Sequence, residues 1–98
     1  MALPSKEQQI ASLRALRRKE RDGYIRWVLL IMELRVLHDA SLLEAERMAL
    51  ANPHRRKWVE RQINTHQRCR KYALAHIRYY SDASLIEREG DSFRFHIR

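Results

Sequence analysis

The residues of this chain with the clearest chemical capacity are cations that recur at helical spacing in its second half. Spacings of four, three, four, three and seven residues place them, with one amide, on a single face of a helix. At a rise of about 1.5 Å per residue such a face runs for roughly 32 Å, near one turn of duplex DNA. We call it the basic strip, and it predicts contacts to a phosphate backbone, with an amide to reach a base edge. Its members are Lys57, Arg61, Asn64, Arg68, Lys71 and Arg78.

The start of the same segment carries cations where a helix prefers anions. His54, Arg55, Arg56 and Lys57 follow Pro53 and would occupy the first helical turn. Each exposed cation there destabilises the helix by about 0.3–1 kcal/mol, and a bound phosphate or acidic side chain would reverse that effect. We therefore add Arg55 and Arg56 to the candidate contacts. The alternative is that these side chains are simply solvated.

Aromatic residues are interleaved with these cations and could stack on unpaired bases. They are Trp58, Tyr72, Tyr79 and Tyr80. Aromatic residues at helical spacing also serve as core, and Trp27 and Trp58 are both assigned to the core.

Metal binding and catalysis find little support in the sequence. His66 and Cys69 are three residues apart, but two ligands do not make a zinc site, and His76 lies about 10 Å further along a helix. Cys69 is interpreted as a small apolar filler. No glycine-rich phosphate loop or nucleophile motif is present, and Glu60 is the one acid of residues 52–81. We expect no metal, no cofactor and no enzymatic activity.

Composition agrees with a polyanionic or acidic partner. The chain has 98 residues and a net charge of +8, and residues 52–81 hold eight Lys or Arg against one acid. Solubility alone is the alternative explanation of the charge. One cysteine fits a reducing compartment, and the longest apolar stretch, Tyr24 to Leu37, is shorter than the roughly 20 residues of a membrane span. A cytoplasmic protein with no membrane contact is expected.

The elements that must position these residues are few and long helices. Ser5 and Gln8 form a capping box, and Asn52 precedes Pro53 as a cap for the basic helix. We predict helices over about 5–22, 24–50 and 53–80, with a second capping box at Ser41 as a sign of a break near residues 38–39. Apolar residues at spacings of three, four and three form either a core-facing seam or the contact of a homodimer. They are Trp27, Leu30, Leu34 and Leu37.

The tail, residues 82–98, carries mixed signals. Ser84 to Glu87 repeats the capping chemistry, with Gly90 as a stop, and residues 93–98 alternate apolar and basic side chains as a strand does. A lone strand has no partner in the predicted fold, so we expect it to pack its phenylalanines on the helices or to join a partner's sheet. Residues 35–46 and 78–89 are identical at seven of twelve positions, interpreted as two independent uses of one capping solution.

The sequence thus predicts an all-α fold, a three- or four-helix bundle-like single domain with a short extended C-terminal tail. The predicted function is that of a small basic nucleic-acid-associated protein, which contacts the phosphate backbone through the 53–80 helix. The alternative is an inhibitor or adaptor that docks its basic strip on the acidic surface of a larger complex.

Overall fold

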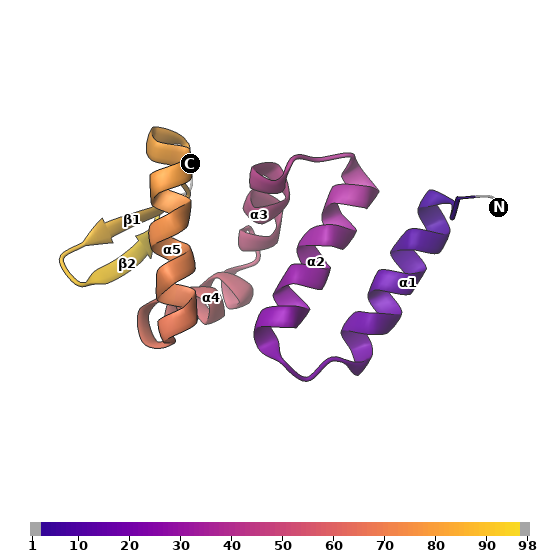
Figure 1. Cartoon of the computed structure of the whole chain (residues 1–98), viewed down its shortest axis with the longest axis horizontal. Helices are drawn as coiled ribbons and strands as arrows, with labels where there is room; N and C mark the ends of the chain where they lie inside the picture. The colour runs from indigo at the N-terminus through magenta and orange to yellow at the C-terminus, as the bar shows by residue number, and fades with distance from the viewer. Residues whose placement is uncertain (1–2, 97–98) are drawn as a thin grey trace. The chain divides into compact units, whose positions relative to one another are not determined.

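The computed structural model describes residues 3–96, which form five α-helices followed by a two-stranded sheet (Figure 1). The mostly helical class predicted from the sequence is confirmed, and the small sheet is an addition to it. The chain divides into two compact units, residues 1–49 and 50–98, and each is described by itself. The expectation that they form one domain stays a prediction.

The first unit contains α1 (Lys6–Lys19), α2 (Gly23–His38) and most of α3 (Leu42–Leu50). The capping box of Ser5 and Gln8 is present, with both of its hydrogen bonds formed. The range of residues 24–50 divides near residues 38–39, as the second capping box indicated: α2 ends at His38, and Asp39 follows it in the left-handed conformation, φ 51°. Ser41 then precedes α3, where its hydroxyl accepts a hydrogen bond from the Glu44 N–H and donates one to the Glu44 carboxylate.

The core of the first unit lies between α2 and α3. Leu30 and Ile31 pack against Ala45 and Ala49, and Trp27 and Leu34 flank this cluster. Alanines at 0% and 1% exposure leave room for the helix backbones to approach each other closely. The apolar seam that could form a homodimer contact is therefore largely covered by residues of α3 in the same chain. The homodimer itself stays a prediction.

An arginine–glutamate cluster fastens α1 to α2. Glu33 is buried, at 5% exposure, and its Oε1 lies 3.3 Å from Arg14 Nε and 3.3 Å from Arg17 Nη2. Arg26 of α2 donates to the carbonyl oxygens of Arg17 and Glu20, at 2.8 and 3.2 Å, and so satisfies the C-terminal end of α1.

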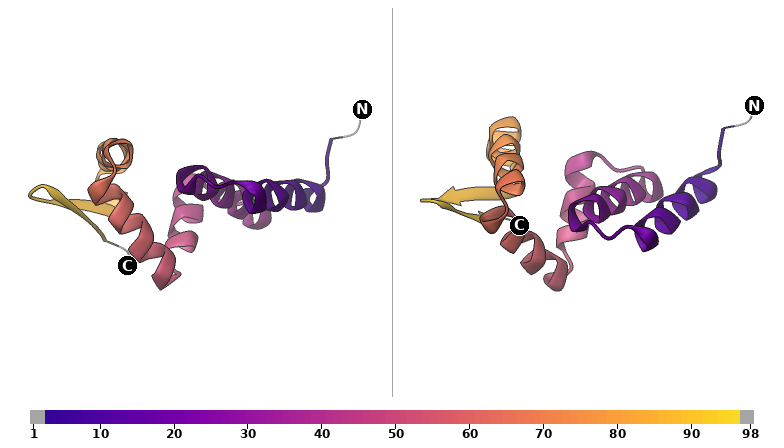
Figure 2. Two further views of the ribbon diagram at one scale, coloured as in Figure 1. Left: turned by 90° about the horizontal axis from the view of Figure 1, so that it is seen from below. Right: turned by 60° about the horizontal axis from the view of Figure 1, so that its bottom comes forward.

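The second unit begins with two helices where the sequence predicted one. The prediction of a continuous helix over residues 53–80 is wrong: α4 (Pro53–Thr65) and α5 (Gln67–Tyr80) are separated at His66, whose backbone is extended at φ −99° and ψ 120°. The axes of α4 and α5 point in clearly different directions: the left view of Figure 2 looks almost along the axis of α5, whereas α4 is seen from the side. The bend lets apolar residues of both helices reach one core, which a straight helix could not do.

The chain ends in a β-hairpin. After a short 3-10 turn, η1 (Ser81–Ala83), the strands β1 (Ile86–Glu89) and β2 (Ser92–Phe95) pair antiparallel, with Ile86 opposite Phe95. Gly90 and Asp91 form the two-residue loop, and Gly90 at φ 62° occupies the first loop position, as in a type II′ turn. The expectation of a strand with no partner in the chain was wrong, as was that of a helical start at Ser84.

The core of the second unit joins both helices to the hairpin. Ile63 of α4, Ala73 of α5 and Phe93 of β2 are buried together. Around them pack Val59, Cys69, Ile77, Ile86 and Phe95. The expected role of Cys69 as core filler agrees with this position. His66, considered in the sequence beside Cys69 as a metal ligand, lies at the bend and is exposed.

Candidate nucleic-acid interface

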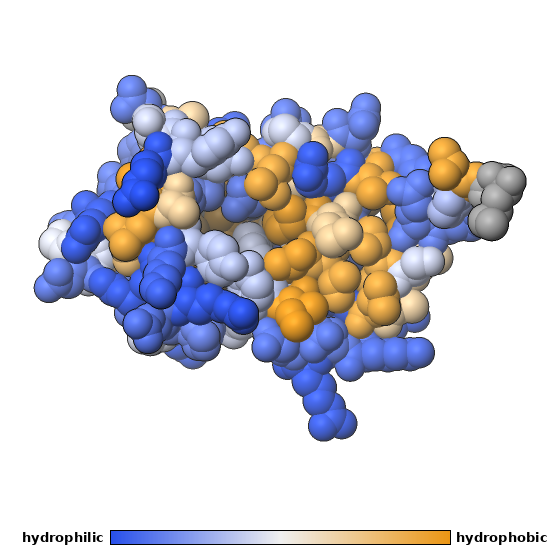
Figure 3. Space-filling view, viewed as in Figure 1, coloured by the Kyte–Doolittle hydropathy of each residue, from blue (hydrophilic) through white to orange (hydrophobic). Residues whose placement is uncertain are grey.

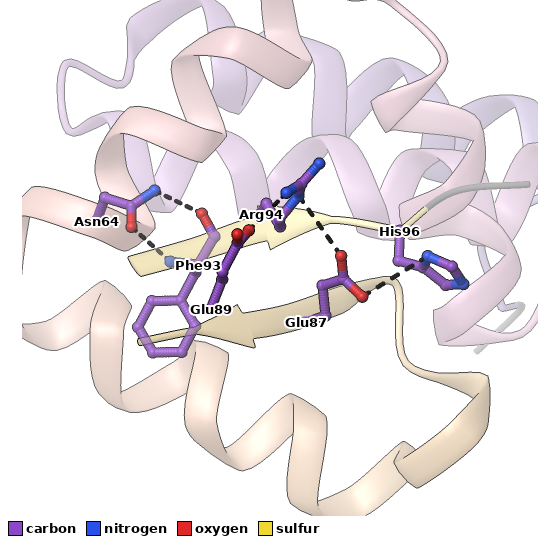
Figure 4. Close-up of polar contacts among 6 residues, drawn as sticks. All are labelled: Asn64, Glu87, Glu89, Phe93, Arg94 and His96. Carbon is purple, nitrogen blue, oxygen red and sulfur yellow. Dashed lines mark hydrogen bonds and ion pairs between the residues drawn. The ribbon is translucent and has the colours of Figure 1, made fainter. Parts of the chain in front are cut away.

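Asn64, predicted to read a base edge, holds the hairpin against α4 (Figure 4). Its Nδ2 donates to the Phe93 carbonyl at 2.8 Å, and its Oδ1 accepts from the Phe93 N–H at 2.6 Å. A further bond runs from Nδ2 to the Glu60 carbonyl, at 2.8 Å. Phe93 faces Arg88 across the hairpin at a position where its N–H and carbonyl point away from β1. The Asn64 amide thus bonds the free edge of β2 as the backbone of a third strand would. Because its donor and its acceptor are both used in this way, we remove Asn64 from the basic strip.

A second side chain of the basic region, Arg70, is also committed to the hairpin. Its guanidinium donates to the carbonyl oxygens of Asp91 at 2.8 Å and Asn64 at 3.1 Å. The same group lies 5.0 Å from the centroid of the Phe93 ring, within the range of a cation–π contact. Arg70 therefore joins α4, α5 and the hairpin loop and offers little to a ligand.

The acids of the hairpin are engaged by the hairpin's own cations. Arg94 bridges Glu87, at 3.5 Å, and Glu89, and the Glu89 hydrogen bond together with the charges of Glu89 and Glu87 raises the pKa of Arg94 above its ordinary value (Figure 4). Arg88 lies 3.8 Å from Asp91. These carboxylates are thus matched by arginines of the hairpin itself.

The N-terminus of α4 lacks the open backbone that a phosphate would need. Asn52 Oδ1 accepts from the N–H groups of His54 and Arg55, at 3.0 and 3.1 Å. The Asn52 carbonyl accepts from Arg56, and Pro53 has no N–H. These bonds use the backbone N–H groups of the first turn, so an anion at this end would have to bind the side chains alone.

The outer side of α4 presents a pair of cations. Lys57 and Arg61 are exposed, and within the part of the chain that the structure describes neither side chain makes an ion pair. Arg55 and Arg56 are half-buried. Trp58, assigned to the core from the sequence, is 38% exposed and so lies at the surface.

The outer side of α5 combines cations with aromatic rings. Cys69, Ala73 and Ile77 face the core, so the residues half a turn away face solvent. We call these residues the α5 face: Arg68, Lys71, Tyr72, Ala75, Arg78 and Tyr79, all of them exposed. Three members come from the predicted basic strip. The sequence places the tyrosines among these cations as candidates for base stacking, but they were not counted as members of the basic strip, although the seven-residue spacing of 71 and 78, and of 72 and 79, was available as a signal.

The basic strip is therefore not one continuous surface. The bend at His66 divides it into a pair on α4, Lys57 and Arg61, and a set on α5, and Asn64 between them faces the hairpin. The larger and more varied surface is the α5 face.

Groups that suggest catalysis or metal binding have structural roles. Ser84 Oγ lies 2.9 Å from His76 Nδ1, but Ser84 is 7% exposed and its hydroxyl donates to the Ile86 carbonyl and accepts from the Ile86 N–H. This serine joins β1 to α5 and is not poised as a nucleophile. Within residues 3–96 no three His, Cys, Asp or Glu side chains gather as metal ligands. None of the described helices is long and apolar enough to cross a membrane.

Comparison of the chain with protein-family models, with curated proteins and with solved structures finds no match.

Proposed function

We propose that this protein binds nucleic acid through phosphate contacts made by the cations of α4 and α5. The observation that carries the proposal is the presence of four exposed cations, Lys57, Arg61, Lys71 and Arg78, whose side chains make no ion pair among the described residues. In the same unit, the carboxylates of Glu87, Glu89 and Asp91 are bound by arginines of the hairpin. A positive surface that its own chain does not neutralise attracts a polyanion.

The binding should have the salt dependence of counterion release. Each phosphate neutralised releases condensed cations, so the logarithm of the affinity falls with the logarithm of salt by about 0.9 per contact on a duplex and about 0.7 on a single strand. Removing two contacting cations should therefore weaken binding and also flatten the salt dependence by roughly 1.4–1.8.

The test is a fluorescence-anisotropy titration of labelled nucleic acid at about 50 and 200 mM salt, with paired substitutions. The variants are Lys57→Ala with Arg61→Ala, and Lys71→Ala with Arg78→Ala. The matched control is Arg18→Ala with Arg21→Ala, which removes the same charge from exposed positions of the first unit. We expect the second-unit variants to lose affinity and salt dependence, and the control to lose little of either.

Equal losses in all three variants would mean that net charge and not a surface is responsible, and the proposal would then be wrong. An absence of binding to any nucleic acid at low salt would also overturn it. The basic surface would then be left to the adaptor hypothesis, in which it docks on an acidic protein.

A specific observation supports a protein partner as a second candidate. The first unit exposes apolar residues at helical spacing on α2: Ile25, Val28 and Met32 are 43%, 37% and 47% exposed. Figure 3 shows apolar side chains gathered over the helices of this unit. Such a grouped apolar surface is typical of a protein contact. Cross-linking of the purified chain to proteins of a cell extract, compared with a Val28→Glu, Met32→Glu variant, tests this candidate.

A further inference from the structure

We propose that the α5 face binds unpaired nucleic acid, with Tyr79 and Tyr72 stacking on bases while Lys71 and Arg78 contact phosphates. This inference rests on the proposed function and names the form of nucleic acid that the surface suits.

The exposure of Tyr79 is the first step of the argument. Its side chain is 81% exposed, the most exposed aromatic residue described, and Tyr72 is 51% exposed. Tyr79 meets Tyr80 edge to face, with ring centroids 4.9 Å apart and an interplanar angle of 82°. Tyr80 in turn packs beside His76 at 4.6 Å and is half-buried. One tyrosine of the pair thus belongs to the body of the unit, and the other presents its ring to solvent.

The α5 face is arranged as two parallel rows. Lys71 and Arg78 are seven residues apart, as are Tyr72 and Tyr79, so each row spans about 10.5 Å along the helix. A seven-residue step drifts only about 20° around the axis, so each row stays nearly straight. The two rows lie about 100° apart, and Ala75 between them adds only a methyl group. Lys71 and Arg78 follow one edge of the face, and the aromatic rings follow the other, where Arg68 lies one turn before Tyr72.

This two-row arrangement matches a single strand better than a duplex. An unpaired strand presents phosphates along one edge and base faces along the other, and stacking on aromatic side chains is independent of sequence. In a duplex the base faces are hidden inside the stack, so a duplex would engage the cations and leave the rings unused. The α5 face therefore predicts a preference for unpaired nucleic acid with little sequence selectivity.

The test compares the full chain on two labelled probes of equal strand length, an oligothymidine of about 12 nucleotides and a blunt-ended, self-complementary duplex without unpaired bases. Replacing Tyr79 with leucine, Tyr79→Leu, should weaken binding to the single strand by roughly 5- to 150-fold. Tyr79→Phe keeps the ring and should retain that binding, and neither change should alter binding to the duplex. Because the side chain is largely exposed, circular dichroism should show the same helix content and melting midpoint for both variants.

The outcomes separate the inference from the proposed function. No binding of the unsubstituted chain to either probe at low salt overturns both. Equal binding to the two probes, with Tyr79→Leu unchanged from Tyr79→Phe, overturns the stacking inference and leaves the phosphate contacts standing. A loss confined to the single strand and to the leucine variant supports both.

Discussion

Replacing Asn64 with alanine should release the hairpin from α4 and destabilise the second unit. The side chain bonds both the N–H and the carbonyl of Phe93, a residue that is 2% exposed. Alanine leaves both backbone groups without these partners, at about 1–3 kcal/mol for each buried group. Asn64 is only half-buried, so the expected loss in unfolding free energy is about 2–4 kcal/mol.

The measurement is urea unfolding followed by tryptophan fluorescence in a Trp27→Phe background. The chain has two tryptophans, so this background leaves Trp58, on α4, as the reporter of the second unit. Amide hydrogen exchange at Phe93 gives an independent readout, since its N–H loses the Asn64 acceptor and should exchange faster.

Thr65→Ala on the same helix is the matched control. The Thr65 hydroxyl donates to the carbonyl of Arg61 in its own helix, at 2.7 Å, and is exposed, so its loss should stay within about 0.5 kcal/mol. If Asn64→Ala lost no more than this control, or if Phe93 exchange stayed the same, the amide would not be what holds β2, and the reasoning would be refuted.

Three further predictions concern other parts of the fold. Glu33→Ala removes a buried carboxylate from two arginines of α1 that remain partly solvated, and should lower the free energy of unfolding by about 1–3 kcal/mol. Urea unfolding followed through Trp27 in a Trp58→Phe background measures this loss. A smaller loss would mean that the cluster does not fasten α1. Gly90→Ala places a methyl where nothing lies within 4 Å but φ is 62°, so backbone strain alone should cost about 1 kcal/mol in thermal unfolding, and a neutral result would contradict the turn type. Because the pKa of Arg94 is raised, its stabilisation is complete below the unfolded-state pKa and is lost only as pH rises through the higher folded-state value. The stability gap between the wild type and Arg94→Gln should thus be equal at about pH 7 and pH 9, and a gap that closes on raising the pH would mean that a group other than Arg94 carries the interaction.

Local signals in the sequence predicted local structure well. The capping box at Ser5 and the cap of Asn52 before Pro53 both form as the sequence indicates, because each is decided by residues within one helical turn. The positive charge of the second half follows from composition, and the outward direction of Lys71 and Arg78 follows from their spacing. What these cations bind is a proposal that spacing and geometry support.

The errors lie where distant residues decide the structure. No glycine or proline marks the bend at His66, and the helical pattern continues on both sides of it, so periodicity predicts one helix. The bend is explained by the core, where Ile63 and Ala73 meet Phe93 from a strand some 20–30 residues further along. Asn64 was misassigned for the same reason, because its partner lies in that strand. A surface predicted from one helix loses members as soon as another element packs against it.

The two similar segments show how far a local signal reaches. Residues 39–44 and 82–87 are identical at five of six positions, yet the first leads into α3 and the second into β1. After the first, helix-forming residues continue, and Ala45 and Ala49 are small enough to pack on α2. After the second, Gly90 ends any helix within its second turn, too early for a stable one, and the Ser84 hydroxyl bonds Ile86 in place of capping. A capping residue therefore fixes where a helix can begin, whereas the residues after it, and the surface they can pack against, determine whether one forms.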